Sequence, residues 1–197
     1  MPNLLYLHGF NSSSRSAKAE VLRDYLNDQR PDWQLIAPQL SSTPAACWAQ
    51  LTRLVAEQKI RACVGSSLGG FFATLLSEKV AIPSVLVNPA VTPAMLLSQA
   101  LGEHTNPYTG ETYILNQTHI EELVQLQPSS ISVERYLVLM TSGDEVLDYR
   151  QAENFYRGAR QCVVPGGDHL FTMFEQYLPE MFSFYDLYHA DEQTDTG

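Results

Sequence analysis

Short apolar runs alternate with longer amphipathic stretches along most of this chain, and this alternation constrains the fold more than any other feature. Apolar runs of about four to eight residues are typical of strands buried on both faces, and parallel strands need crossover helices between them. The predicted strands cover residues 3–7, 33–37, 60–65, 83–87, 136–140 and 161–164, and the predicted helices cover 16–29, 47–59, 68–79, 149–157 and 170–187. We therefore expect a three-layer α/β fold whose sheet is mostly parallel and has about six strands.

Residues 91–128 interrupt the alternation. Two segments within them, 94–101 and 120–126, have helical patterns, whereas residues 106–111 have the composition of a turn. We interpret this stretch as a small helical cap inserted after a strand of a single domain that spans residues 1–187. Residues 188–197 are polar and acidic, and we expect them to form a disordered tail.

The charge distribution argues against several classes of partner. The 197 residues include 22 acidic and 12 basic side chains, for a net charge of −10. No basic stripe is available to bind a nucleic-acid backbone or anionic lipids, so we expect neither partner. No apolar run approaches the roughly 18 residues that a membrane span needs, and the N-terminus lacks a signal-peptide pattern, which predicts a cytoplasmic protein.

The three cysteines, Cys47, Cys63 and Cys162, are far apart and form no CxxC pair. Their number and spacing favour reduced thiols over a disulfide framework or a zinc site. The sequence predicts no metal and no cofactor, and it leaves the oligomeric state open.

The motif with the clearest chemical meaning is the G-x-S-x-G pattern at residues 65–69, which contains Ser67. It follows the predicted strand 60–65 and precedes the predicted helix 68–79. This is the setting of a nucleophile elbow, a tight turn that exposes the serine hydroxyl at the edge of a sheet. We therefore expect Ser67 to be a nucleophile held in a strained backbone conformation.

A serine hydroxyl needs a general base, and the base needs an acid that orients it. Among the five histidines, His169 is the best candidate base because it follows the last predicted strand in a glycine-rich loop. The acid should lie between Ser67 and His169 in the chain, and Asp144 follows the strand 136–140. Asp148 and Glu145 remain alternative acids.

Acyl transfer also needs two donors for the oxyanion of the tetrahedral intermediate. The backbone N–H of Leu68 is one candidate, because it follows the nucleophile at the start of a helix. The second candidate is the N–H of Phe10, in the loop after the first strand. His8 is expected to shape this loop, and His8, Phe10 and Ser66 are candidates for contacts with substrate.

These motifs together resemble those of a small α/β-hydrolase. Within that superfamily the chain resembles the YqiA-like esterases, in the segments YLHGFNS (6–12), GSSLGGFFA (65–73), NPA (88–90) and NPYTG (106–110). The resemblance covers about residues 1–187. It implies a serine hydrolase acting on carboxylic esters or acyl thioesters, with Ser67, Asp144 and His169 as its triad.

The expected activity is hydrolysis of carboxylic esters of small to medium acyl chains, without a cofactor. The sequence leaves open an acyl-CoA thioesterase with the same triad, although no clear cluster of Lys and Arg is present to bind the phosphates of CoA. A peptidase, an acyltransferase and a non-catalytic binding module with a hydrolase fold are further alternatives. The substrate depends mainly on the cap, whose packing the pattern does not predict.

Overall fold

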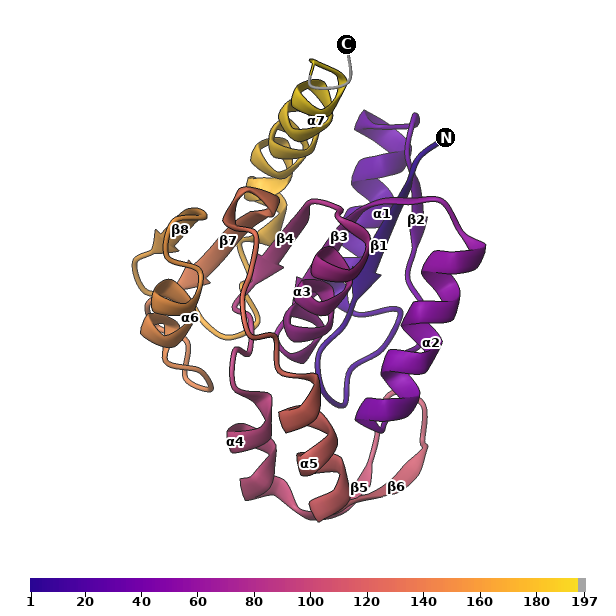
Figure 1. The fold of residues 1–197 in the computed structure, drawn as a ribbon, viewed down its shortest axis with the longest axis vertical. Helices are drawn as coiled ribbons and strands as arrows, with labels where there is room; N and C mark the ends of the chain where they lie inside the picture. Colours follow the sequence, from indigo (N-terminus) through magenta and orange to yellow (C-terminus); the bar gives the residue numbers. More distant parts are fainter. Residues whose placement is uncertain (195–197) are drawn as a thin grey trace.

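A computed structural model describes residues 1–194 of the chain. Its centre is one sheet of six parallel strands in the order β2-β1-β3-β4-β7-β8 (Figure 1). The strands are β1 (Asn3–Leu7), β2 (Gln34–Ile36), β3 (Ile60–Ser66), β4 (Ser84–Val87), β7 (Tyr136–Thr141) and β8 (Arg160–Val164). The predicted three-layer architecture and all six predicted strands are confirmed.

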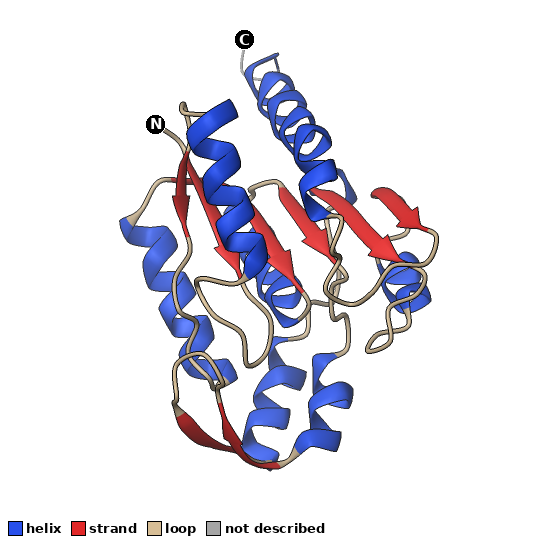
Figure 2. Cartoon of the chain, turned by 180° about the vertical axis from the view of Figure 1, so that it is seen from behind, coloured by secondary structure: helices blue, strands red, loops and turns tan. Residues whose placement is uncertain are grey.

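Helices cover both faces of the sheet. Figure 2 shows α1 (Ala17–Gln29) and α7 (Leu178–Thr194) on one face, and α2 (Pro44–Glu57), α3 (Leu68–Val80) and α6 (Tyr149–Phe155) on the other. Side chains alternate along each strand, so Leu4 and Tyr6 pack toward α1 and α7 whereas Leu5 and Leu7 pack toward α2 and α3. Burial on both faces explains why these strands are continuous apolar runs.

The segment 91–128 lies beyond the carboxyl ends of the strands (Figure 1). It contains α4 (Pro93–Leu97), a 3₁₀ turn (Ser98–Ala100), β5 (Gly102–Thr105), β6 (Thr112–Leu115) and α5 (Gln117–Leu126). The expectation of a purely helical cap was incomplete, because β5 and β6 pair as an antiparallel hairpin. The residues predicted to form a turn are the connection of this hairpin.

The closing helix begins later than predicted. Residues 174–177 form a 3₁₀ turn, and α7 starts only at Leu178. Phe171 has φ of 51° and buries its ring completely, which interrupts a helix over residues 170–173. Pro179 lies in the first turn of α7, where the missing N–H of proline costs no hydrogen bond.

The C-terminal segment also differs from its prediction as a disordered tail. Helix α7 continues through Thr194, and residues 195–197 of the predicted tail lie outside the described residues. His189 explains part of this order, because its Nδ1 accepts a hydrogen bond from Arg61 at 3.0 Å and its ring stacks on Trp33. No helix within residues 1–194 is long and apolar enough to cross a bilayer.

Candidate active site

Ser67 occupies the turn between β3 and α3. Its φ of 55° and ψ of −121° put a non-glycine residue in a strained conformation, as the sequence predicts for a nucleophile elbow. The Ser67 N–H donates to the carbonyl of Val87 at 3.0 Å, and its own carbonyl accepts the N–H groups of Gly70 and Ala90. Backbone contacts with β4 and α3 therefore hold the turn.

Two glycines of the motif allow this turn to form. A Cβ atom built on Gly69 would lie 2.1 Å from the carbonyl oxygen of Leu7, and one built on Gly65 would lie 2.4 Å from the carbonyl oxygen of Gly69. Both distances are far below van der Waals contact, so helix α3 can approach β1 and β3 only because these positions lack side chains.

His169 lies in the loop between β8 and α7 and reaches over the elbow. Its Nε2 atom is 3.0 Å from Ser67 Oγ, and its Nδ1 atom is 2.8 Å from Asp144 Oδ2. An ionised carboxylate can only accept, so Nδ1 carries the ring proton and Nε2 accepts the Ser67 hydroxyl proton. In this arrangement the imidazole can act as a general base toward Ser67.

Asp144 follows β7, and its side chain is almost fully buried. Its Oδ1 atom accepts the N–H groups of Val146 and Leu147, both at 2.8 Å. Burial alone would raise the pKa of Asp144, but the hydrogen bonds from His169 and from the two backbone N–H groups together keep that pKa below its usual value. Asp144 is therefore held as a carboxylate beside His169.

The two alternative acids have other partners. Asp148 is the N-cap of α6 and accepts the N–H of Arg150 at 3.1 Å. Glu145 accepts the backbone N–H of His169 at 3.0 Å. Asp144 is thus the acid bonded to the His169 ring. The side chain of Glu145 instead contacts the backbone N–H of His169.

The remaining histidines have other hydrogen-bond partners. His104 Nε2 contacts the carbonyl of Ala100, His119 takes part in a capping box at the start of α5, and His189 accepts from Arg61. His169 is the histidine whose ring contacts Ser67.

Asn88 is a positioning residue. Its place in the NPA segment, at the end of a predicted strand, indicated no role for it. It is buried, has φ of 41°, and follows β4 directly. Its Nδ2 atom donates to the carbonyls of Asp168 and His169 at 3.0 and 3.2 Å, and its Oδ1 atom accepts the N–H of Thr141 at 2.9 Å. Asn88 therefore ties the base-bearing loop to β4 and β7.

A cleft of about 860 Å³ opens beside Ser67 and His169. Phe10 and Ser66, two of the predicted substrate contacts, are among the residues that line it. Its apolar wall comes from α1, α4 and the segment after β8, and includes Val21, Leu97, Phe171 and Phe174. A volume of this size is typical of a small-molecule site.

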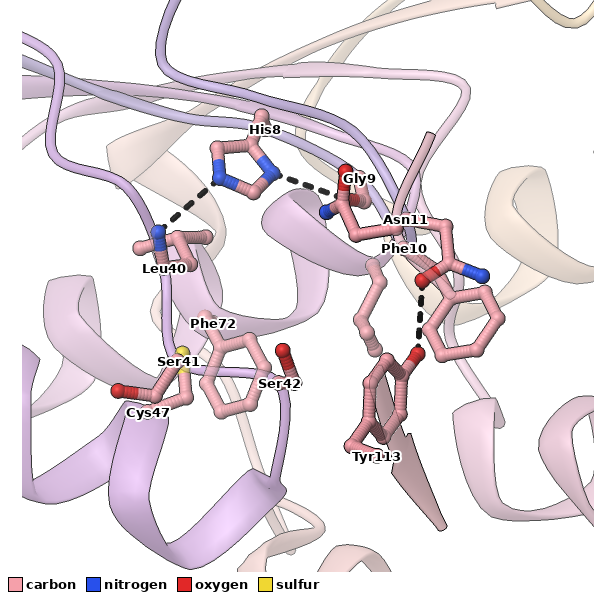
Figure 3. Close-up of a pocket in the computed structure, with 12 residues that line it drawn as sticks. His8, Gly9, Phe10, Asn11, Leu40, Ser41, Ser42, Cys47, Phe72 and Tyr113 are labelled. Atoms are coloured by element: carbon pink, nitrogen blue, oxygen red, sulfur yellow. Dashed lines mark hydrogen bonds between the residues drawn. The ribbon is translucent and has the colours of Figure 1, made fainter. Parts of the chain in front are cut away.

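His8 is part of the loop structure and faces a separate, smaller pocket (Figure 3). Its Nε2 atom accepts the N–H of Leu40 at 3.0 Å, and its Nδ1 atom contacts the carbonyl of Gly9 at 2.9 Å. Burial lowers the pKa of His8, although the contact with Gly9 raises it. Both ring nitrogens of His8 thus have backbone partners, and His8 is not among the residues that line the cleft beside Ser67.

The two predicted oxyanion donors belong to residues close to Ser67 in space or in sequence. Leu68 is the first residue of α3, and Phe10 is next to Gly9, at which an added Cβ would lie 3.2 Å from Ser67 Cβ. Within residues 1–194, no acceptor takes the N–H of Phe10 or Leu68. Both donors therefore remain available beside the serine.

Metal-binding side chains do not cluster in the described part of the chain. No group of three or more His, Cys, Asp or Glu residues within 1–194 is arranged to hold a metal ion. The three cysteines are free thiols, and burial raises the pKa of Cys47 to about 12. A buried thiol with such a pKa is a poor ligand and a poor nucleophile at neutral pH.

Comparison with known proteins relates nearly the whole chain to one family. The family model described as "Uncharacterised protein family (UPF0227)" matches residues 3–186.

Solved structures also resemble this fold. Est1E from Butyrivibrio proteoclasticus is 16% identical with a TM-score of 0.69, over 96% of this chain and 87% of Est1E. Alpha/beta hydrolase domain-containing protein 10 from mouse is 15% identical with a TM-score of 0.68, over 93% of this chain and 90% of the mouse protein. An alpha/beta superfamily hydrolase from Oenococcus oeni is 15% identical with a TM-score of 0.63, over 96% of this chain and 92% of that protein. The fold is therefore that of the α/β-hydrolases.

Proposed function

This chain belongs to the UPF0227 family of YqiA-like proteins, and from that premise we propose that it is a serine esterase acting on carboxylic esters of small to medium acyl chains. The observation that carries the proposal is the pair of hydrogen bonds from Ser67 Oγ to His169 Nε2 and from His169 Nδ1 to Asp144 Oδ2, at 3.0 and 2.8 Å. The cleft beside the serine offers room for a substrate.

In the first step, Ser67 Oγ attacks the ester carbonyl carbon while its proton moves to His169 Nε2. The carbonyl π electrons move onto the carbonyl oxygen, which becomes the oxyanion. When the intermediate collapses, the bond to the alkoxy oxygen breaks, and that oxygen takes the proton from Nε2. An alcohol leaves, and the acyl group stays on Ser67.

In the second step, water attacks the acyl carbon and gives one proton to His169 Nε2. Collapse of this intermediate breaks the bond to Ser67 Oγ, which recovers the proton, and a carboxylic acid is released. Asp144 stays ionised throughout, because its role is to keep the imidazole oriented and to stabilise its positive charge. The low pKa of Asp144 supports this role.

The N–H groups of Phe10 and Leu68 are the proposed oxyanion donors. Leu68 begins a 13-residue helix, so its N–H lies at the positive end of the helix dipole. Such a donor typically lowers the barrier by about 3 kcal/mol, because its hydrogen bond strengthens as the negative charge develops.

Active-site labelling tests the proposal. The protein is treated with a fluorophosphonate, and the modified peptide is identified by mass spectrometry. We expect the adduct on Ser67, together with a loss of about 10³-fold or more in p-nitrophenyl ester hydrolysis by Ser67→Ala. Ser183→Ala, at an exposed position of α7, is the matched control and should keep both label and activity.

Two results would contradict the esterase. A folded protein that stays unlabelled and hydrolyses no ester would favour a binding module. Higher kcat/KM for acyl-CoAs than for p-nitrophenyl esters of the same acyl chain would favour the thioesterase.

A further inference from the structure

Lys18 is a cation in the wall of the cleft that the proposed reaction does not use. It lies in the first turn of α1, is partly buried, and lines the same cavity as Ser67 and His169. The wall of this cavity includes the apolar side chains of Val21, on the next turn of α1, and of Phe171, in the segment after β8. An ammonium group in such surroundings loses hydration and needs compensation from an anion.

Among the described residues, no carboxylate pairs directly with Lys18. Within residues 1–194, the Lys18 ammonium has no hydrogen-bond acceptor and no carboxylate oxygen within 4.0 Å. Asp168 acts on it electrostatically from farther away, but the two oxygens of Asp168 already accept the N–H and O–H of Thr172. Among the described residues, Lys18 therefore lines the cleft without a hydrogen-bond or ion-pair partner.

Other charged or titratable groups around the cleft do not replace Lys18. Arg15 is 84% exposed and pairs with Glu20 at 3.4 Å, which directs its charge toward solvent. Glu175 lies at the exposed rim, and the Tyr6 hydroxyl contacts Ser16 at 2.9 Å. The remaining titratable groups of the wall are His169, already bonded to Ser67, and the exposed Tyr108.

We propose that Lys18 binds a carboxylate carried by the ester substrate, an inference that rests on the esterase function proposed above. A single lysine is a compact point charge, and the nearby Asp168 reduces the positive potential around it. These features suit one monoanionic group better than a phosphate dianion, which proteins usually bind with several converging donors. The preferred substrates are therefore half-esters that keep a free carboxylate.

Matched substrates test this specificity. We would measure kcat/KM for p-nitrophenyl half-esters of dicarboxylic acids over a series of chain lengths, beside analogues whose free end is a neutral carboxamide or a phosphate. At the best chain length, we expect the wild type to prefer the carboxylate over the carboxamide by about tenfold or more. Lys18→Met should abolish that preference, and Lys18→Arg should retain most of it, because arginine keeps the charge.

The pH dependence provides a second readout. Burial lowers the pKa of Lys18 to about 8, although Asp168 raises it. Lys18 is charged below this pH and neutral above it, so the carboxylate preference in kcat/KM should fall between pH 7 and pH 9. Lys18→Arg should show a flat ratio, since arginine stays protonated over this range. Lys59→Met, at an exposed position just before β3, is the control and should keep the wild-type ratio and its pH profile.

Each outcome separates the two proposals. If the wild type hydrolyses carboxylate and carboxamide esters equally, or if Lys18→Met keeps the preference, the role of Lys18 is wrong and the esterase stands. A stronger preference for the phosphate analogue would overturn the carboxylate assignment. If the wild type hydrolyses none of the esters and Ser67 stays unlabelled, both proposals fall.

Discussion

The nucleophile elbow and the hairpin of the segment 91–128 lie at the same end of the molecule, but different forces hold them. The elbow depends on backbone atoms packed too closely for any side chain at Gly65 or Gly69. The hairpin is attached through side chains. Tyr113 donates to Asn11 at 2.8 Å, and the Phe10 ring meets Tyr113 edge-on (Figure 3). Asn106 also donates to the carbonyl of Ser12 at 2.9 Å.

This difference means that the position of the reacting serine and the shape of the cleft depend on different parts of the molecule. A backbone-packed turn has little freedom to move or to vary, so it can hold a reacting atom within hydrogen-bond distance of its base. Contacts between side chains can be exchanged one at a time at modest cost. The segment 91–128, which contributes Leu96, Leu97 and Tyr108 to the cleft, can therefore change its lining without disturbing Ser67.

The largest effect should come from Asp144, the acid that orients the base beside the nucleophile elbow. Asp144→Asn removes the charge that orients His169, and we expect turnover of p-nitrophenyl esters to fall by about 10³ to 10⁴-fold. Asp148→Asn is the matched control, because asparagine remains a good N-cap for α6. Steady-state kinetics give the turnover of both variants. If Asp148→Asn lowered turnover more than Asp144→Asn, the acid would have to be reassigned.

The same substitution in the two regions should give different losses of stability. Gly69→Ala places a Cβ against the Leu7 carbonyl, and we expect the free energy of unfolding to fall by about 3 kcal/mol or more. Gly110→Ala, at φ of 74° in the hairpin connection with open space around it, should cost about 1 kcal/mol of backbone strain. Urea unfolding measures both losses, and equal losses would contradict the comparison.

The smallest effect should follow from loosening the hairpin. Tyr113→Phe removes one hydrogen bond to Asn11, and we expect a loss of about 1 kcal/mol in the free energy of unfolding. The KM for a p-nitrophenyl ester should rise about twofold to fivefold while kcat stays within about twofold, because the elbow is untouched. Tyr149→Phe, on α6, serves as the control, and a large loss of kcat in Tyr113→Phe would mean that the two regions are coupled.

Much of this architecture could be predicted because its signals are local. Each parallel strand is a short apolar run, and the G-x-S-x-G motif lies between a strand and a helix. The carboxyl ends of parallel strands meet at one edge of a sheet, so loops that follow β3, β7 and β8 bring Ser67, Asp144 and His169 together. The G-x-S-x-G motif, the glycine-rich loop before His169 and the order along the chain indicated Ser67, His169 and Asp144, with Asp148 and Glu145 left as alternative acids.

The features that could not be predicted depend on contacts between distant segments. The residues of β5 and β6 are mostly exposed, so the hairpin lacks the buried face that makes a strand visible in a sequence. Asn88 is recognisable only once β4, β7 and the loop 165–169 are neighbours. The late start of α7 depends on the burial of Phe171, which outweighs the helical pattern of the residues around it.

The order of strands in the sheet has a consequence for incompletely folded chains. Ser67 belongs to the middle of the sheet, whereas Asp144 and His169 follow the two last strands on one side, β7 and β8. A chain that has paired β1, β3 and β4 but has not yet docked β7 and β8 has the Ser67 hydroxyl without Asp144 and His169 beside it. Under the proposed mechanism, we therefore expect nascent, clipped or partly denatured molecules to be inactive, and recovery of turnover during refolding to follow the docking of β7 and β8.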